Sequence, residues 1–229
     1  MSVELQKRAA AEYAAGLVQG GMTVGLGSGT TAEIAVQILG QRFREGLRFV
    51  GVATSARTAE IATSFGIPLR RLDERSHLDI NIDGADEFDP HLNLVKGRGG
   101  ALTREKLVAT AADTFVVIVD ESKRVSRLGE KAPIPVEVVQ FGWPTTRHRL
   151  ELLGLSCDLR GGDVPYTTSN GNYILDCRST GPVDLADFRV AREIKLQTGV
   201  VDHGLFLGMA ALVVIGTDDG EIELLEAPR

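Results

Sequence analysis

Residues 22–43 read MTVGLGSGTTAEIAVQILGQRF and hold three local patterns in direct succession. The segment MTVGL is typical of a short buried strand, and GSGTT is typical of a tight turn. From Ala32 to about Phe43 the residues follow a helical pattern. A strand that enters a helix through a glycine turn is the building unit of α/β proteins, so this stretch predicts that class of fold.

The same alternation continues along the first half of the chain. Further strands are expected at 48–54, 67–72, 78–83 and 114–119, and further helices at 55–65 and 102–112. An additional amphipathic helix is expected at the N-terminus, with Leu5, Ala9 and Leu17 near one face. Strands that alternate with helices predict a doubly wound, mainly parallel, Rossmann-like sheet.

After Pro133 and Pro135 the order of the patterns changes. The expected elements are a strand at 136–141, a helix at 144–153, a strand at 155–159, a hairpin turning at Asn170-Gly171, a helix at 185–197 and a strand at 199–206. This βαββαβ order favours a small ferredoxin-like α+β unit. The apolar segment 210–216 is expected to rejoin the main sheet. We therefore predict a Rossmann-like domain at 1–130, an inserted ferredoxin-like domain at 131–206 and a return to the main domain at 207–229.

The composition restricts the kinds of partner. The chain has 31 acidic and 25 basic residues and a net charge of −6, whereas nucleic-acid-binding domains are typically basic. No apolar run approaches the ~20 residues of a membrane-spanning helix, and the N-terminus lacks a signal-peptide core. We expect a cytoplasmic protein with no nucleic-acid or membrane partner. Cys157 and Cys177 show no metal or redox spacing and are expected to be structural thiols.

Polar clusters follow four of the predicted strands. They are Gly27–Thr31, Thr54-Ser55, Asp83–Asp86 and Asp120–Lys123. Because ligands bind beyond the carboxyl ends of parallel strands, these clusters are expected to outline one crevice. The four histidines of the chain are scattered without ligand spacing, so no metal site is predicted.

The first cluster suits a phosphate. Glycines allow close approach of the backbone, and amide N–H groups at a helix start favour an anion. Thr30 and Glu33 match a capping box, which supports a helix beginning here. An ordinary strand-to-helix turn remains the alternative. A dinucleotide site is disfavoured, because the glycines are out of register and no acidic residue follows the second strand. Lys123 is either a second charge for the phosphate or a solvated lysine.

Glu105 falls in the middle of an apolar helical stripe. Ala101, Leu102, Val108 and Ala109 lie within about 60° of it on a helical wheel. A carboxylate that faces a core is costly unless it is paired or serves chemistry, and burial would raise its pKa toward that of a useful base. A structural glutamate bonded to nearby backbone is the alternative.

Two further motifs add charge near the same strand. Asp83 and Asp86 flank Gly84-Ala85, so both are expected to reach the crevice unless they only cap a turn. Lys96 precedes the glycine loop 97–100, whose amides suit a developing oxyanion. Arg98 is expected to point to solvent or to a partner surface.

The chain resembles the type A ribose-5-phosphate isomerases over essentially its whole length. The matching segments are GLGSGTT (25–31), DGADE (83–87), KGRGGALTREK (96–106), DESK (120–123) and PVEV (135–138). The resemblance implies interconversion of D-ribose 5-phosphate and D-ribulose 5-phosphate through an enediolate, in the non-oxidative pentose phosphate pathway. It also implies a homodimer or homotetramer and no metal or organic cofactor.

The resemblance assigns roles by matching motif. Glu105 would be the base, Asp83 and Asp86 would handle hydroxyl protons and ring opening, and Lys96 would stabilise the oxyanion. The implied substrate-binding residues are Ser28, Gly29, Thr30, Thr31, Asp83, Gly84, Ala85, Asp86, Lys96, Gly97, Arg98, Gly99 and Lys123. The role of Arg98 stays in doubt, because the family varies there. A non-catalytic phosphosugar sensor is one rival, but no basic helix-turn-helix segment accompanies the fold. An acyl-CoA transferase that uses a covalent glutamate is the other.

Overall fold

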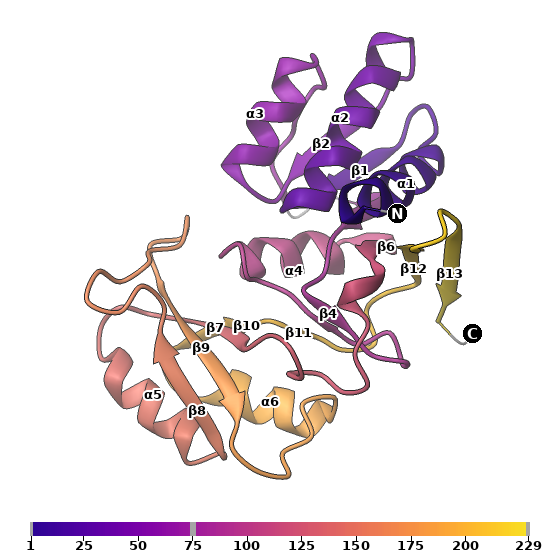
Figure 1. The fold of residues 1–229 in the computed structure, drawn as a ribbon. Helices are drawn as coiled ribbons and strands as arrows, with labels where there is room; N and C mark the ends of the chain where they lie inside the picture. Colours follow the sequence, from indigo (N-terminus) through magenta and orange to yellow (C-terminus); the bar gives the residue numbers. More distant parts are fainter. Residues whose placement is uncertain (1, 74–76, 228–229) are drawn as a thin grey trace. The chain divides into compact units, whose positions relative to one another are not determined.

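The computed structural model describes residues 2–73 and 77–227, and its chain folds into two compact units (Figure 1). The first unit holds the residues up to Ala85, Arg104–Lys123 and those from Met209 onward. The second holds Asp86–Thr103 and Arg124–Gly208. Two of the predicted boundaries, after residues 130 and 206, lie close to the crossings after Lys123 and Gly208. The sequence analysis did not predict that residues 86–103 belong to the second unit.

The first unit is built on a six-stranded sheet in the order β13-β12-β6-β3-β1-β2. These strands are β1 (Thr23–Leu26), β2 (Val50–Ala53), β3 (Leu78–Asp83), β6 (Ala112–Asp120), β12 (Leu212–Gly216) and β13 (Ile222–Glu226). All neighbours are parallel except β12 and β13, so the predicted doubly wound, mainly parallel sheet is confirmed. The sequence missed β13. Of the expected strand at 67–72, only a single parallel bridge between Gly51 and Leu69 forms.

Helices cover both faces of this sheet. They are α1 (Val3–Gly16), α2 (Thr30–Arg44), α3 (Ala56–Ser64) and α4 (Leu102–Thr110). The first three share one apolar cluster with the inward side chains of β1, β3 and β6. Helix α4 covers the opposite face, where Val108 packs against Val52 and Leu78. None of the described helices is long and apolar enough to cross a membrane.

The buried face of α1 differs from the predicted one. Leu5 is 52% exposed, whereas Ala10, Ala11, Ala14 and Ala15 are fully buried. Helix α1 packs against α2, β6 and β12, and alanine side chains allow such close approach on several sides. On hydrophobicity alone, leucine is expected to be buried in preference to alanine. The space between the packed elements favoured the smaller alanine side chains instead.

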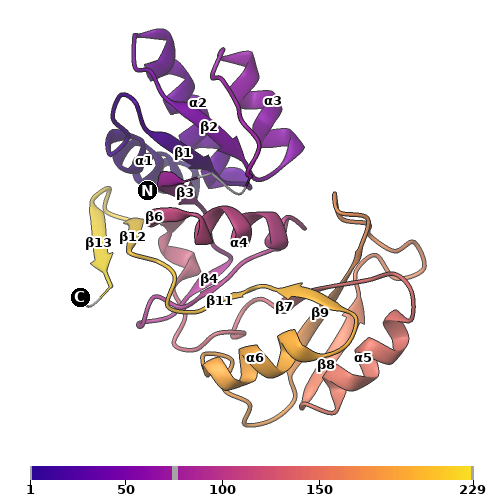
Figure 2. The same cartoon turned by 180° about the vertical axis from the view of Figure 1, so that it is seen from behind.

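The second unit contains a four-stranded antiparallel sheet in the order β10-β7-β9-β8. Its elements are β7 (Ile134–Val138), α5 (Trp143–Glu151), β8 (Leu155–Leu159), β9 (Tyr173–Ser179), α6 (Phe188–Leu196) and β10 (Val200–His203). Helices α5 and α6 lie next to this sheet (Figure 2), and their buried side chains share one apolar cluster with it. The order of the elements and of the strands confirms the predicted ferredoxin-like unit.

A small three-stranded sheet completes the second unit. Its strands are β4 (Glu87–Phe88), β5 (Leu94–Val95) and β11 (Leu205–Phe206). The expected strand at 199–206 is therefore divided at Gly204 between two sheets. The expected hairpin is also only partly correct. The turn is present, since Gly171 donates to the Thr168 carbonyl at 2.9 Å, but residues 160–169 directly before it form no strand, and β9 pairs instead with β7 and with the more distant β8.

Cys157 and Cys177 form a disulfide, which corrects the prediction of structural thiols. The two residues are direct partners across β8 and β9, and both are fully buried. Paired residues of adjacent strands present their side chains on the same face. Their separation of 20 residues gave no hint of this pairing before the register of the strands was known.

Candidate active site

Asp83 ends β3 and lies against the glycine turn that follows β1. Its Oδ1 accepts hydrogen bonds from the amides of Ser28 at 3.0 Å and Gly84 at 2.7 Å, and the side chain is fully buried. A Cβ on Gly27 would lie 2.6 Å from the Asp83 Cα, so only glycine allows this approach. The turn and the first predicted aspartate therefore form one structural group within the first unit.

Helix α2 begins at Thr30 with Gly29 as its N-cap. The capping box expected from Thr30 and Glu33 is wrong, because Thr30 is already the first helical residue. Gly29 has φ 93° and no side chain to cap the helix. The first amides of a helix lack intrahelical acceptors and favour an anion, so this end of α2 suits a phosphate.

Hydroxyl groups tie the turn to the neighbouring strand ends. Ser28 Oγ lies 2.5 Å from Thr54 Oγ1, and the Thr54 hydroxyl donates to the Leu26 carbonyl at 3.1 Å. Thr58 Oγ1 donates to the Gly27 carbonyl at 2.8 Å. The turn is therefore held by side chains of the β2 end and of α3. Thr31, the second residue of α2, is buried.

Glu105 is 5% exposed and lies in the first turn of α4. Leu102, Val108 and Ala109 are buried beside it on the helix, whereas Leu107 is 53% exposed. The structure thus confirms that Glu105 lies in the apolar stripe. A buried carboxylate on a short, rigid helix has the chemistry of a positioned general base.

The cluster after β6 begins with Asp120, which is buried and accepts hydrogen bonds from Ser122. Lys123 ends the 3₁₀ turn Glu121–Lys123 and is half-buried. Within the described chain, its ammonium group forms no hydrogen bond or ion pair with protein atoms. A partly desolvated lysine of this kind is suited to an anionic ligand.

Asp86, Lys96 and the glycine loop belong to the second unit. The Asp86 amide donates to the Val95 carbonyl at 2.8 Å. The Asp86 side-chain Oδ2 accepts a hydrogen bond from the Arg98 amide at 2.9 Å. Lys96 is only 2% exposed, and its Nζ lies 5.6 Å from the centre of the Phe206 ring. A buried ammonium group of this kind supplies concentrated positive charge next to the loop.

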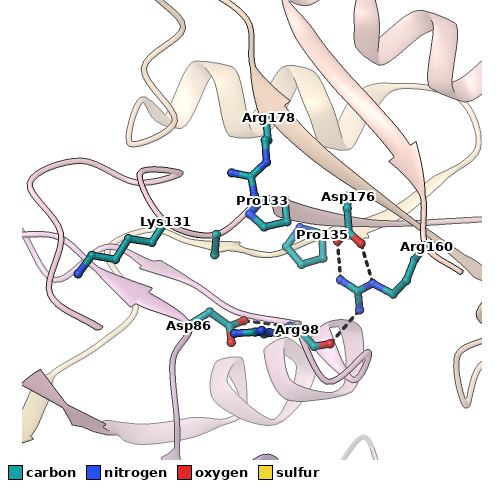
Figure 3. A pocket seen from close by; sticks show the side chains of 9 residues that line it. Asp86, Arg98, Lys131, Pro133, Pro135, Arg160, Asp176 and Arg178 are labelled. Carbon is teal, nitrogen blue, oxygen red and sulfur yellow. Dashed lines mark hydrogen bonds and ion pairs between the residues drawn. The ribbon is translucent and has the colours of Figure 1, made fainter. Parts of the chain in front are cut away.

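The loop 97–100 lies beside a charged pocket of about 350 Å³ in the second unit (Figure 3). Asp86, Arg98, Arg160 and Asp176 are among its lining residues. Arg160 Nη1 donates to the carbonyls of Gly97 at 3.1 Å and Arg98 at 3.0 Å. The Tyr166 hydroxyl donates to the Gly99 carbonyl at 3.4 Å, and its ring occupies the space that a Cβ on Gly100 would need.

The structure thus distributes the predicted residues over both units. It brings Ser28, Asp83 and Gly84 into direct contact in the first unit, and Asp86 and Arg98 in the second. Glu105 and Lys123 belong to the first unit, whereas Lys96, Gly97 and Gly99 belong to the second. Across residues 2–73 and 77–227, no three His, Cys, Asp or Glu side chains gather as a metal-binding group would.

Several residues next to these groups were missing from the predicted set. Lys7 Nζ donates to Thr30 Oγ1 at 3.0 Å, which adds a cation at the start of α2. Glu137 is fully buried and accepts from Thr103, two residues before Glu105. The matching segment PVEV contained Glu137 and offered a signal, but nothing in the sequence linked Lys7 or Arg160 to the loops they contact.

Comparisons with known proteins agree on one family. The family model described as ribose 5-phosphate isomerase A (phosphoriboisomerase A) matches residues 50–220. A ribose-5-phosphate isomerase A from a Synechococcus species is 52% identical over 96% of this chain and 96% of its own length. One from Thermomicrobium roseum is 51% identical over 100% and 97%.

Solved structures give the same result. Ribose 5-phosphate isomerase from Plasmodium falciparum superposes with a TM-score of 0.93 and 38% identity over 100% of both chains. A D-ribose-5-phosphate isomerase in complex with phospho-erythronic acid gives a TM-score of 0.93 and 37% identity over 99% of this chain and 100% of its own. This chain therefore belongs to the ribose 5-phosphate isomerase A family.

Proposed function

We propose that this chain interconverts D-ribose 5-phosphate and D-ribulose 5-phosphate, an aldose–ketose isomerisation of the non-oxidative pentose phosphate pathway. The observation that carries the proposal is the membership of the family over essentially the full length of the chain. The buried Glu105 supports it independently, because an isomerase of this kind needs a base that moves one carbon-bound proton.

In the proposed reaction, Glu105 takes the proton from C2 of the open-chain aldose and an enediolate forms. The same carboxylic acid then returns the proton to C1, which gives the ketose. Asp83 and Asp86 transfer hydroxyl protons and assist opening of the sugar ring. These transfers leave atoms and charges balanced without any redox partner.

Charge stabilisation is assigned to cationic and amide groups. Lys96 and the amides of Gly97 and Gly99 stabilise the oxygen that gains negative charge in the enediolate, whereas the Arg98 amide is bonded to Asp86. The phosphate is held by Ser28–Thr31 and by Lys123, with Gly84 and Ala85 beside the sugar. The half-buried Lys123 and the exposed helix start at Thr30 support this assignment.

We also propose that the enzyme needs no metal or organic cofactor, works in the cytoplasm and forms a homodimer or homotetramer. A cytoplasmic location would make the Cys157–Cys177 disulfide unusual, since cytosolic thiols are generally kept reduced. Thiol titration of the protein purified under non-reducing conditions would establish the state of this pair.

The decisive experiment is a coupled assay of ribose 5-phosphate conversion by the purified protein, repeated after exhaustive chelation. Conversion that survives chelation supports the proposal. A protein that binds the phosphosugar without turnover would be a sensor, and this outcome would refute the isomerase. Loss of activity on chelation that Mg²⁺ or Mn²⁺ restores would refute the metal-free mechanism. Phospho-erythronic acid, the ligand named for a related structure, serves as a binding probe that does not react.

A further inference from the structure

Arg160 lies far from the candidate catalytic residues in sequence but is bonded to the loop that contains several of them. It comes directly after β8 and is separated from the loop by about sixty positions. Its Nη1 donates to two successive loop carbonyls, those of Gly97 and Arg98. One guanidinium edge therefore fixes two consecutive peptide groups.

The guanidinium group is itself held in place. Arg160 Nε and Nη2 donate to the two oxygens of Asp176 at 2.9 and 2.5 Å, a bidentate pair. Only 16% of the Arg160 side chain and 23% of the Asp176 side chain are exposed. Asp176 is on β9, between strands β7 and β8, so its position is set by the middle of a sheet. The planar fork of arginine is suited to bond a carboxylate and the loop at once, which lysine cannot do.

The two fixed carbonyls determine where the loop amides point. In a trans peptide the N–H group points away from the C=O of the same peptide group. The Arg98 amide accordingly points away from Arg160 and donates to Asp86 Oδ2. By the same geometry the Gly99 amide is directed away from Arg160. Among the described residues, no protein atom accepts a hydrogen bond from it.

We propose that Arg160, held by Asp176, is a positioning residue for the isomerase: it fixes the carbonyls of Gly97 and Arg98 and so directs the Gly99 amide toward the developing oxyanion of the substrate. The inference rests on the proposed function of this loop. The arrangement fixes the donor before the charge develops, so it lowers the barrier rather than strengthening the binding of the ground state.

The test is Arg160→Lys, which keeps the positive charge and removes the fork. We expect kcat to fall about 10- to 100-fold, the range for small displacements of a catalytic group, while KM changes less than about threefold. Hydrogen exchange of the peptide that covers residues 97–101 should become faster. Asp176→Asn, which weakens the support but leaves Arg160, should lower kcat in the same direction by a smaller factor.

Arg178→Lys is the matched control. Arg178 lines the same pocket and is exposed, and within the described chain its guanidinium group donates no hydrogen bond. This variant should keep the kcat, KM and loop exchange of the wild-type protein. A purely structural role for Arg160 would instead lower the melting temperature with an unchanged kcat of the folded protein.

Each remaining outcome decides the question. A folded Arg160→Lys variant with wild-type kcat overturns the proposal, whatever its loop exchange. If that variant does not fold, the kcat of Asp176→Asn decides, and an unchanged value overturns the proposal. Failure of the wild-type protein to isomerise ribose 5-phosphate would refute the proposed function instead, which is a distinguishable result.

Discussion

The two units hold their candidate functional groups by different means. In the first unit, Asp83 is fixed by amides of its immediate surroundings, at the ends of parallel strands that are already paired. In the second, the loop 97–100 is fixed by side chains, chiefly Arg160 and Tyr166, from the segment between β8 and β9.

The comparison shows that the functional residues of a motif and the contacts that hold them in place can come from different parts of the chain. A strand end with a glycine turn carries its own support, because backbone pairing places the turn and the aspartate together. A glycine loop has no such pairing and needs partners from elsewhere in the chain. The ferredoxin-like unit is therefore more than a spacer, since it supplies those partners.

The largest effect is expected from a change of Glu105, the candidate catalytic base in the first unit. Glu105→Gln keeps the size of the side chain and removes the base. Turnover of ribose 5-phosphate, and exchange of its C2 proton with solvent, should fall by at least the ~10²–10⁴ that a positioned base contributes. Phospho-erythronic acid should still bind within a few-fold, and thermal melting should be unchanged or slightly raised. Proton exchange near the wild-type rate would assign the base elsewhere, with Asp83 as the next candidate.

The next effect concerns support in the second unit. Glu137 accepts hydrogen bonds from Thr103, Thr168, Asn170 and Asn172. Glu137→Ala would leave these donors without their acceptor in a buried place, so we expect a loss of about 3 kcal/mol in the free energy of unfolding. Chemical denaturation measures it.

Glu151→Ala serves as the control for Glu137. Glu151 is paired with Arg147 on the partly exposed surface of α5, where such pairs contribute less than about 1 kcal/mol. If both variants lost the same free energy of unfolding, the buried Glu137 carboxylate would give the loops no special support. The proposed difference between the two units, support by backbone against support by side chains, would then be refuted.

A smaller effect is expected at the glycine turn of the first unit. Gly27→Ala would force a methyl group onto Asp83, at the cost of about 1–3 kcal/mol in stability, typical of overpacking. It should also lower activity, because the turn and Asp83 move together. Gly16→Ala, at the end of α1 with nothing near its Cβ position, should be neutral or slightly stabilising. A fully active, fully stable Gly27→Ala protein would contradict the close approach.

The smallest effect depends on pH and lies away from both sites. Bonds from the Arg189 side chain, and then from its amide, hold the pKa of Asp187 below its usual value. Because the folded pKa is lowered, this carboxylate stabilises the fold above its ordinary pKa, and the effect is lost as the pH falls through the lowered value. Asp187→Asn should therefore melt slightly below the wild-type protein at pH 7, and the difference should begin to shrink at about pH 4 and vanish only below the lowered pKa of Asp187. Asp163→Asn, an exposed loop change of the same charge, should show no such difference.

Local patterns predicted most of the fold because they are written in neighbouring residues. The strand-turn-helix order at 22–43 produced β1 and α2, and the βαββαβ order produced the ferredoxin-like unit. The errors have physical causes. The buried face of α1 depends on the space left by other elements, and the capping box at Thr30 failed because the helix begins one residue earlier than expected, with Gly29 at the N-cap.

The sequence by itself determined the fold class, the family likeness and the burial of Glu105, because strand alternation, glycine turns and helical periodicity are local properties of the chain. Only the tertiary structure decided the Cys157–Cys177 pair, the four bonds to Glu137 and the attachment of Arg160 to the loop at Gly97 and Arg98. Each of these contacts joins residues many positions apart. Strand register and loop path bring them together, and neither is encoded in any single stretch of the chain.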